Sequence, residues 1–221
     1  MKKLIAFLFV MICIKAFTQP KEMPLLAYKG TDQNKPVIYY ISGDGGWNSF
    51  STSLIKGFTN AGYSVIALNS RSYFWTRKSP QQAAADVSSS INQYAKAWNI
   101  KSIVFIGYSF GADVMPFIQT SLPVNLSNMV HHIILMSPSR KTDFEIHLLG
   151  MMGLGNSHGK SVPDEINKLN IPVTLIFGSD ENDFPVRDIK VKKIETIKLA
   201  GGHHYDGNVD ELIKKITDKI K

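Results

Sequence analysis

Short apolar runs alternate with longer amphipathic segments from residue 37 to the end of the chain, and this alternation limits the possible folds more than any other feature. It is typical of a mostly parallel β-sheet covered by helices on both faces. The predicted strands span residues 37–41, 63–69, 102–107, 133–136, 173–177 and 194–199. The predicted helices span residues 50–61, 80–98, 110–120 and 208–220. Residues 20–36 are expected to precede this fold.

The first eighteen residues have the features of a cleavable signal peptide. Lys2 and Lys3 precede an apolar run over residues 4–14, and small residues at Ala16 and Thr18 follow it. This apolar run is too short to span a bilayer. We therefore expect residues 1–18 to be removed, and residues 19–221 to form one domain, because a chain of 221 residues suits a single core.

Cysteine content and charge exclude several kinds of chemistry. The only cysteine, Cys13, lies inside the predicted leader, so the mature chain has neither a disulfide nor a thiol nucleophile. The formal net charge is +7, and three of these charges, on Lys2, Lys3 and Lys15, leave with the leader, giving +4. That charge is compatible with anionic lipid head groups, but by itself it favours an ordinary solubilising surface charge. The sequence has no basic stripe interleaved with aromatic residues, so nothing indicates binding to nucleic acid. We also expect the protein to be a monomer.

A nucleophile motif follows the predicted strand over residues 102–107. The sequence Gly-Tyr-Ser-Phe-Gly, centred on Ser109, lies between this strand and a helical segment, as a nucleophile elbow requires. Glycines at positions 107 and 111 fit a turn too sharp for side chains on either side. The motif predicts a compact α/β-hydrolase fold without a large lid domain, with Ser109 as the nucleophile.

A serine nucleophile of this fold needs an acid and then a histidine later in the chain. Acids at positions 180, 181 and 183 follow the strand over residues 173–177, and a Gly-Gly-His-His-Tyr segment follows the strand over residues 194–199. We predict His203 as the general base, with His204 as the alternative. We predict Asp183 as the acid that orients it, with Glu181 as the alternative.

Two backbone N–H groups are candidates for the oxyanion hole. One belongs to Phe110, directly after the nucleophile. The other belongs to Asp44, in a glycine-rich loop over residues 42–47 whose backbone can approach a substrate closely. No lysine follows this loop at the spacing of a phosphate-binding P-loop. We expect neither a metal site nor a cofactor.

Four blocks of sequence resemble the VirJ/AcvB family of bacterial periplasmic proteins. They are Ser-Gly-Asp-Gly-Gly-Trp at 42–47, Tyr-Phe-Trp at 73–75 with Pro80, Gly-Tyr-Ser-Phe-Gly-Ala-Asp-Val at 107–114, and Gly-Gly-His-His-Tyr-Asp-Gly at 201–207. The resemblance implies an α/β-hydrolase-like protein of the periplasm that hydrolyses lysyl-phosphatidylglycerol to lysine and phosphatidylglycerol. It also implies a link to virulence, and a secretion-system protein is a candidate partner.

An aminoacylated anionic phospholipid as substrate would need contacts for a phosphate and an ammonium group. Arg71, Arg77 and Lys78 are candidates for the phosphate, although the family tends to carry its arginine one position later, at Ser72. Asp44 and Asp113 are candidates for the ammonium. Asp113 has an alternative role, because an acid in the first turn of a helix complements the helix dipole.

Tyr73, Phe74 and Trp75 are candidates for the wall of the lipid pocket. Aromatic residues after a strand serve equally often in local packing.

Two other functions also remain open at this point, because the fold and the triad do not specify the acyl group. One is a general esterase of small substrates, and the other is a non-catalytic periplasmic binding module associated with secretion machinery.

Overall fold

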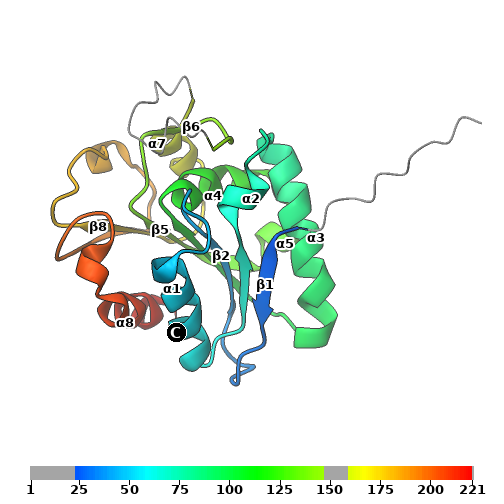
Figure 1. Cartoon of the computed structure of the whole chain (residues 1–221). Helices are drawn as coiled ribbons and strands as arrows, with labels where there is room; N and C mark the ends of the chain where they lie inside the picture. The colour runs from blue at the N-terminus through cyan, green and yellow to red at the C-terminus, as the bar shows by residue number, and fades with distance from the viewer. Residues whose placement is uncertain (1–22, 147–158, 221) are drawn as a thin grey trace, which may run out of the picture.

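The computed structural model describes residues 23–146 and 159–220, so the expected signal peptide lies outside the described residues. The strands of its main sheet are β1 (Leu25–Tyr28), β2 (Val37–Ile41), β3 (Val65–Leu68), β4 (Ile103–Tyr108), β5 (Val130–Met136), β8 (Val173–Gly178) and β9 (Ile194–Leu199). Their order is β1-β3-β2-β4-β5-β8-β9. Only β1, at one edge, runs antiparallel to its neighbour in this described sheet. The predicted mostly parallel sheet is confirmed (Figure 1).

The predicted helices are also present. The helices are α1 (Ser49–Asn60), α2 (Ser70–Tyr73), α3 (Pro80–Trp98), α4 (Phe110–Ser121), α5 (Val124–Ser127), α7 (Val162–Ile166) and α8 (Val209–Lys219). Two short strands, β6 (Lys141–Thr142) and β7 (Lys160–Ser161), pair outside the main sheet. The 3-10 turns η1 (Val186–Asp188) and η2 (Tyr205–Gly207) complete the described elements. Sequence patterns missed the short elements because two to five residues are too few to show a period.

Strand β1 was not predicted, since residues 20–36 were expected to precede the fold. It pairs antiparallel with β3, Leu25 lying opposite Leu68. An edge strand of four residues carries little alternation, and here every residue is partly or fully exposed. Strand β1 therefore forms because the edge of β3 offers hydrogen-bond partners, and its own sequence has no hydrophobic alternation that would predict a strand.

Two apolar cores hold helices on the two faces of the sheet. The interior strand β2 is buried along its whole length, with Tyr39 and Ile41 in one core and Ile38 and Tyr40 in the other. The first core takes apolar side chains from α3, α4 and α7, and the second takes them from α1 and α8. The α/β layering is thus as predicted, with helices on both faces (Figure 1).

Local capping signals set the ends of the longest helix. Ser79 caps α3 by accepting a hydrogen bond from the backbone of Gln82, whose side chain accepts one in return. Pro80 occupies the first helical position, and Asn99 ends the helix in the left-handed region with φ 49°. Among residues 23–146 and 159–220, no helix has the length and apolar character needed to cross a membrane.

Candidate active site

The nucleophile elbow joins β4 to α4 in the middle of the sheet. Ser109 stands between the last residue of β4 and the first residue of α4, with φ 52° and ψ −120°. A serine at positive φ is strained and persists only where the surroundings fix it. Here the Ser109 N–H donates to the carbonyl of Met136 on the neighbouring strand at 2.8 Å. The strained turn therefore presents the Ser109 side chain at the carboxyl end of the sheet.

The two glycines of the motif are required by close backbone approach. A Cβ atom on Gly107 would lie 2.4 Å from the carbonyl oxygen of Gly111. A Cβ atom on Gly111 would lie 2.2 Å from the carbonyl oxygen of Ile41. Both distances are too short for any side chain. For Gly107 this geometry agrees with a turn that leaves no room for a side chain, whereas Gly111 is required by the approach of the β2 backbone.

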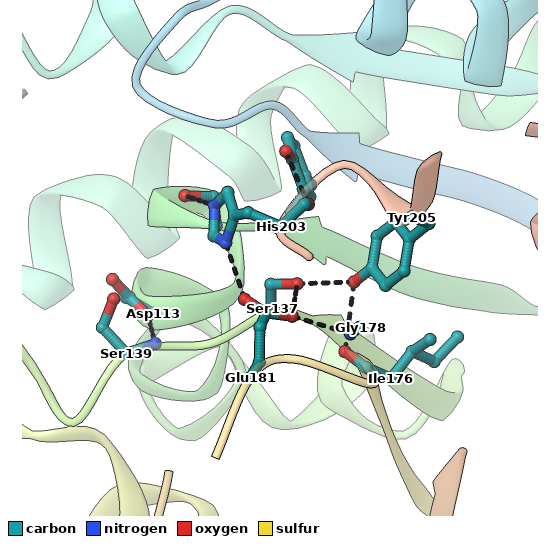
Figure 2. A network of polar contacts seen from close by, with 10 residues as sticks. Asp113, Ser137, Ser139, Ile176, Gly178, Glu181, His203 and Tyr205 are labelled. Carbon is teal, nitrogen blue, oxygen red and sulfur yellow. Dashed lines mark hydrogen bonds and ion pairs between the residues drawn. The ribbon is translucent and has the colours of Figure 1, made fainter. Parts of the chain in front are cut away.

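Three side chains from distant parts of the chain meet in one hydrogen-bonded row. His203 Nε2 lies 2.9 Å from Ser109 Oγ, and His203 Nδ1 lies 2.7 Å from Glu181 Oε1. The three residues follow β4, β8 and β9, which all end at the same edge of the sheet. Figure 2 shows the imidazole of His203 directed at the Glu181 carboxylate. The row has the geometry of a nucleophile, a base and an orienting acid.

The acid in this row is Glu181 and not Asp183, the residue that the sequence predicts. Nδ1 of His203 is occupied by Glu181, whereas Asp183 is exposed two residues farther along the loop. The turn after β8 explains the choice, because the N–H of Glu181 donates to the carbonyl of Gly178 at 3.1 Å. This tight turn brings position 181 back over the end of the strand.

Hydrogen bonds hold Glu181 in its ionised form. Burial would raise the pKa of Glu181, but hydrogen bonds from His203, Ser137 and the Gly178 backbone outweigh burial and bring this pKa below its ordinary value. The last two are donated to Oε2, at 2.6 Å and 2.8 Å. The carboxylate can thus face the imidazole with a full negative charge.

The second histidine of the pair points elsewhere. The ring of His204 packs edge-on against Phe50, with ring centroids 5.8 Å apart. The backbone of His203, in contrast, is held in place by Tyr108, whose Oη donates a hydrogen bond to the His203 carbonyl at 3.1 Å. Of the two candidates for the base, only His203 contacts Ser109 among the described hydrogen bonds.

The glycine-rich loop over residues 42–47 lies against the nucleophile. A Cβ atom on Gly43 would lie 3.3 Å from Ser109 Cβ. The carbonyl of Gly43 accepts hydrogen bonds from the Ser70 hydroxyl and from the N–H of Gly46, the latter at 2.9 Å. The loop is therefore fixed next to Ser109, with Asp44 as the following residue. Phe110 begins α4, where backbone N–H groups have no intrahelical acceptor.

Asp113 lies one helical turn after Ser109 and is buried. Its Oδ1 accepts a hydrogen bond from the Ser139 N–H at 2.5 Å, as Figure 2 shows. Burial, opposed by the Ser139 hydrogen bonds and reinforced by the charge of Asp44, raises the pKa of Asp113 to about 8. At neutral pH this carboxyl is mostly protonated, so it is poorly suited to pair with an ammonium group.

The aromatic candidates for a lipid wall occupy two different environments. Tyr73 is buried in the core, and its hydroxyl donates to Asp86 Oδ2 at 2.5 Å. Its ring packs edge-on against Phe74, with centroids 4.7 Å apart. Trp75, in contrast, is 51% exposed. Tyr73 thus serves the local packing considered above as its alternative role, and Trp75 remains available at the surface.

The three basic candidates also differ in their surroundings. Arg77 is paired with Glu145 at 2.9 Å and with Asp143 at 3.7 Å. Lys78 Nζ lies 5.0 Å from the centroid of the Tyr73 ring. Arg71 is exposed and adjoins the glycine-rich loop, because a Cβ atom on Gly46 would lie 3.1 Å from Arg71 Cβ. Arg71 is therefore the basic candidate that borders the loop beside Ser109.

Sequence reasoning missed the residues that support the acid and the base. Ser137 and Tyr108 contact Glu181 and His203, and neither had been assigned a role. A serine directly after a buried strand, at the same edge as the elbow, was the available signal for Ser137. Within the described part of the chain, no cluster of three or more His, Cys, Asp or Glu residues is arranged to hold a metal ion.

Comparison with protein families gives a match over most of the chain. A family model described as "Bacterial virulence protein (VirJ)" matches residues 35–221. This range includes Ser109, Glu181 and His203. None of the curated proteins compared with this chain by sequence matches it.

Comparison with solved structures identifies the fold. Est1E from Butyrivibrio proteoclasticus has a TM-score of 0.60 at 12% identity, covering 88% of this chain and 90% of that one. An esterase from Pyrococcus furiosus has a TM-score of 0.62 at 13% identity, covering 89% of each chain. A monoacylglycerol lipase from Paleococcus ferrophilus has a TM-score of 0.59 at 13% identity, covering 90% and 99%. The predicted α/β-hydrolase fold is confirmed.

Proposed function

Because the chain belongs to the VirJ family of bacterial virulence proteins, we propose that it is a serine hydrolase that cleaves the aminoacyl ester of lysyl-phosphatidylglycerol. The observation that carries the hydrolase proposal is the row from Ser109 through His203 to Glu181, with contacts of 2.9 Å and 2.7 Å. The names of two proteins of similar fold, an esterase and a monoacylglycerol lipase, support an ester as the bond that is broken.

The first half of the reaction acylates the serine. Ser109 Oγ attacks the ester carbonyl carbon while its proton passes to His203 Nε2. Glu181 stabilises the imidazolium that forms. The tetrahedral intermediate then breaks the bond to the glycerol oxygen of phosphatidylglycerol, and that oxygen takes the proton from His203. The product on the enzyme is a lysyl ester of Ser109.

The second half releases lysine. Water attacks the lysyl ester and gives its proton to His203, and Ser109 Oγ leaves and takes that proton back. In both halves the N–H groups of Phe110 and Asp44 are our candidates to donate to the oxyanion. Support for this pair comes from the position of Phe110 at the start of α4 and from the contact between Gly43 and Ser109.

The lysyl ammonium is best matched by Asp44. Asp44 is partly exposed, and its charge is near enough to the buried Asp113 to raise the pKa of that residue. Asp113 is mostly neutral at pH 7 and is engaged by Ser139, so it is the weaker candidate. A carboxylate in the loop beside the nucleophile would favour a cationic acyl group over a neutral one.

The head-group phosphate is best matched by Arg71. It is exposed beside the same loop, whereas Arg77 is already paired with two carboxylates. Trp75, which is exposed, would contact the lipid at the membrane surface. This substrate is compatible with the expected export of the chain to the periplasm, where we also place any secretion-system partner.

The decisive experiment measures lysine release. Purified protein lacking residues 1–18 is incubated with vesicles containing lysyl-phosphatidylglycerol, beside the variant Ser109→Ala, and a fluorophosphonate probe tests Ser109 separately. We expect release by the wild type and a loss of several orders of magnitude in the variant. Arg71→Glu should lower turnover of this lipid more than turnover of a neutral short-chain ester.

Two other outcomes would replace the proposal. Labelling of Ser109 without lysine release, together with turnover of short p-nitrophenyl esters, would indicate a general esterase of small substrates. Absence of both labelling and release would indicate the non-catalytic binding module.

A further inference from the structure

The hydroxyl of Ser137 lies between the acid and a buried tyrosine. Ser137 Oγ is 2.6 Å from Glu181 Oε2 and 2.7 Å from Tyr205 Oη. Ser137 is 2% exposed and Tyr205 is 1% exposed. Figure 2 shows the two hydroxyl groups and the carboxylate as a continuous chain beside the contact between Glu181 and His203. The mechanism above uses neither hydroxyl.

The number of hydrogens fixes the direction of this chain. An ionised carboxylate only accepts hydrogen bonds, so Ser137 must donate its single hydrogen to Glu181. The contact with Tyr205 therefore uses the tyrosine hydrogen, with Ser137 as acceptor. The same tyrosine hydrogen also faces the carbonyl of Ile176, at 3.1 Å, but the contact with Ser137 is the shorter. The order of donation is Tyr205 to Ser137 to Glu181.

The backbone of Ser137 is strained at the residue whose hydroxyl contacts the acid. Its φ is 50°, in the left-handed region that glycine adopts at lower cost. The Ser137 N–H is held by the carbonyl of Ile176 at 2.7 Å. Strain of this kind is concentrated at functional sites. A serine here supplies a donor at a place where its backbone is unfavourable.

We propose that Ser137 and Tyr205 are positioning residues, which act in series to hold the Glu181 carboxylate in the orientation that His203 requires. The proposal rests on the proposed hydrolase function. Ser137 fixes Oε2 and thereby turns Oε1 toward the imidazole, while Tyr205 fixes Ser137. Neither hydroxyl contacts the reacting atoms.

The electrostatics agree with this geometry. Burial would raise the pKa of Glu181, and the hydrogen bond from Ser137 is one of the contacts that lower it instead. Loss of the Ser137 hydroxyl should therefore raise this pKa and loosen the carboxylate at the same time. Gly178 N–H would remain as a donor to Oε2, at 2.8 Å. The effect should be a partial loss of function.

The test compares Ser137→Ala, Tyr205→Phe and the double variant. Ser137→Gly is added because glycine accepts φ 50° without strain, so any failure of the alanine variant to fold can be recognised. Two readouts are used: the rate at which a fluorophosphonate labels Ser109, and the downfield proton NMR signal of the His203 Nδ1 hydrogen. Tyr39→Phe, which removes a buried hydroxyl bonded to Ser90, and Ser179→Ala, in the acid loop, are the matched controls.

We expect both Ser137 variants to label about tenfold more slowly, the equivalent of one hydrogen bond to a charged group. The Nδ1 signal should broaden or shift in the same variants. Tyr205→Phe should have a smaller effect, about twofold to fivefold, because Ser137 can still donate. The double variant should label no more slowly than Ser137→Ala, since residues acting in series are not additive. Both controls should match the wild type.

Three results would overturn or redirect the inference. Folded Ser137 variants with wild-type labelling and an unchanged Nδ1 signal would refute it. A double variant whose losses multiply would refute the serial arrangement. If the wild type itself fails to label, the hydrolase proposal fails instead, and the Nδ1 signal alone still decides whether Ser137 positions the acid.

Discussion

The protonation states of individual side chains at this site depend on burial as much as on neighbouring charges. Asp113 is the clearest case, because it lies one turn after the nucleophile and has a pKa raised from 3.8 to about 8. Glu181, three residues past the end of a buried strand, keeps its charge because three donors surround it. Two carboxyl groups in one site thus differ in protonation at neutral pH, which is how such sites separate roles.

The raised pKa of Asp113 predicts a pH-dependent stability. The unfolded chain releases this proton near pH 3.8 and the folded chain holds it to about pH 8, so rising pH lowers the free energy of unfolding within that window. Between these two pH values, the free energy of unfolding of the wild type should fall by up to about 1.4 kcal/mol per pH unit relative to that of Asp113→Asn. Above about pH 8 the difference between the two proteins should stay constant. Urea unfolding of both proteins at pH 5, 7 and 9 checks this. Parallel curves would show that Asp113 is ionised in the folded protein.

The choice of acid is testable by a matched pair of substitutions. Glu181→Gln should lower kcat by about a hundredfold or more, because the imidazolium loses its carboxylate. Asp183→Asn, two residues away on the exposed part of the loop, should stay within about twofold of the wild type. Ester hydrolysis at saturating substrate measures both. A larger loss for Asp183→Asn would restore the acid first favoured from the sequence.

At the scale of elements, the site depends on how closely α4 approaches β2. Gly111, in the first turn of α4, lies against the carbonyls of Ile41 and Ser42, where β2 passes into the glycine-rich loop. The same approach brings Gly43 against Ser109. The nucleophile and its candidate oxyanion donors are therefore positioned by a single contact between two backbones.

Gly111→Ala should damage this contact. The added Cβ would lie 2.2 Å from the Ile41 carbonyl oxygen, so either the helix or the loop must move. We expect a loss of about 1–3 kcal/mol in the free energy of unfolding and a larger loss of Ser109 labelling. Gly202→Ala is the stability control, because its nearest neighbour would be 3.9 Å away, and it should cost less than about 0.5 kcal/mol. Equal stability of both variants would argue against the close approach.

At the scale of the whole molecule, the site combines a residue that follows a central strand with a residue that follows an edge strand. Ser109 follows β4, which is buried along its length between β2 and β5, whereas His203 follows the edge strand β9, most of which is partly or fully exposed. Helix α8 covers this region through Leu212 and Ile216, and Lys219 pairs with Glu195 of β9 at 2.6 Å. Figure 1 shows α8 beside α1, beneath the end of the sheet that holds β8.

Local opening should therefore separate the base from the nucleophile before the core unfolds. We expect amide hydrogen exchange at residues 194–199 to be at least about tenfold faster than at residues 103–108. Ser109 labelling should be lost at a lower urea concentration than helical circular dichroism. Coincident loss of the two signals would instead show that β9 and α8 unfold only together with the centre of the sheet.

The sequence alone determined the layered α/β fold and the candidates for the nucleophile, the base and the acid. Strand and helix periodicities are local, and the elbow motif itself spans five residues. Only Gly107 is required within that motif, whereas Gly111 is required by the approach of the β2 backbone. His203 and Glu181 are both candidates because each lies in a loop after a predicted strand, in the chain order that this fold requires.

Only the tertiary structure decided between near neighbours in the chain. Glu181 rather than Asp183 faces the site because the turn after β8 brings position 181 back over the end of the strand. His203 rather than His204 faces it because the ring of His204 packs against Phe50. Several decisive contacts join residues that are more than twenty positions apart in the chain. They are the hydrogen bond from Ser139 to Asp113, the ion pair of Arg77 with Glu145, and the hydrogen bond from Ser137 to Glu181. Such contacts depend on the register of strands and the packing of helices, which no local pattern records.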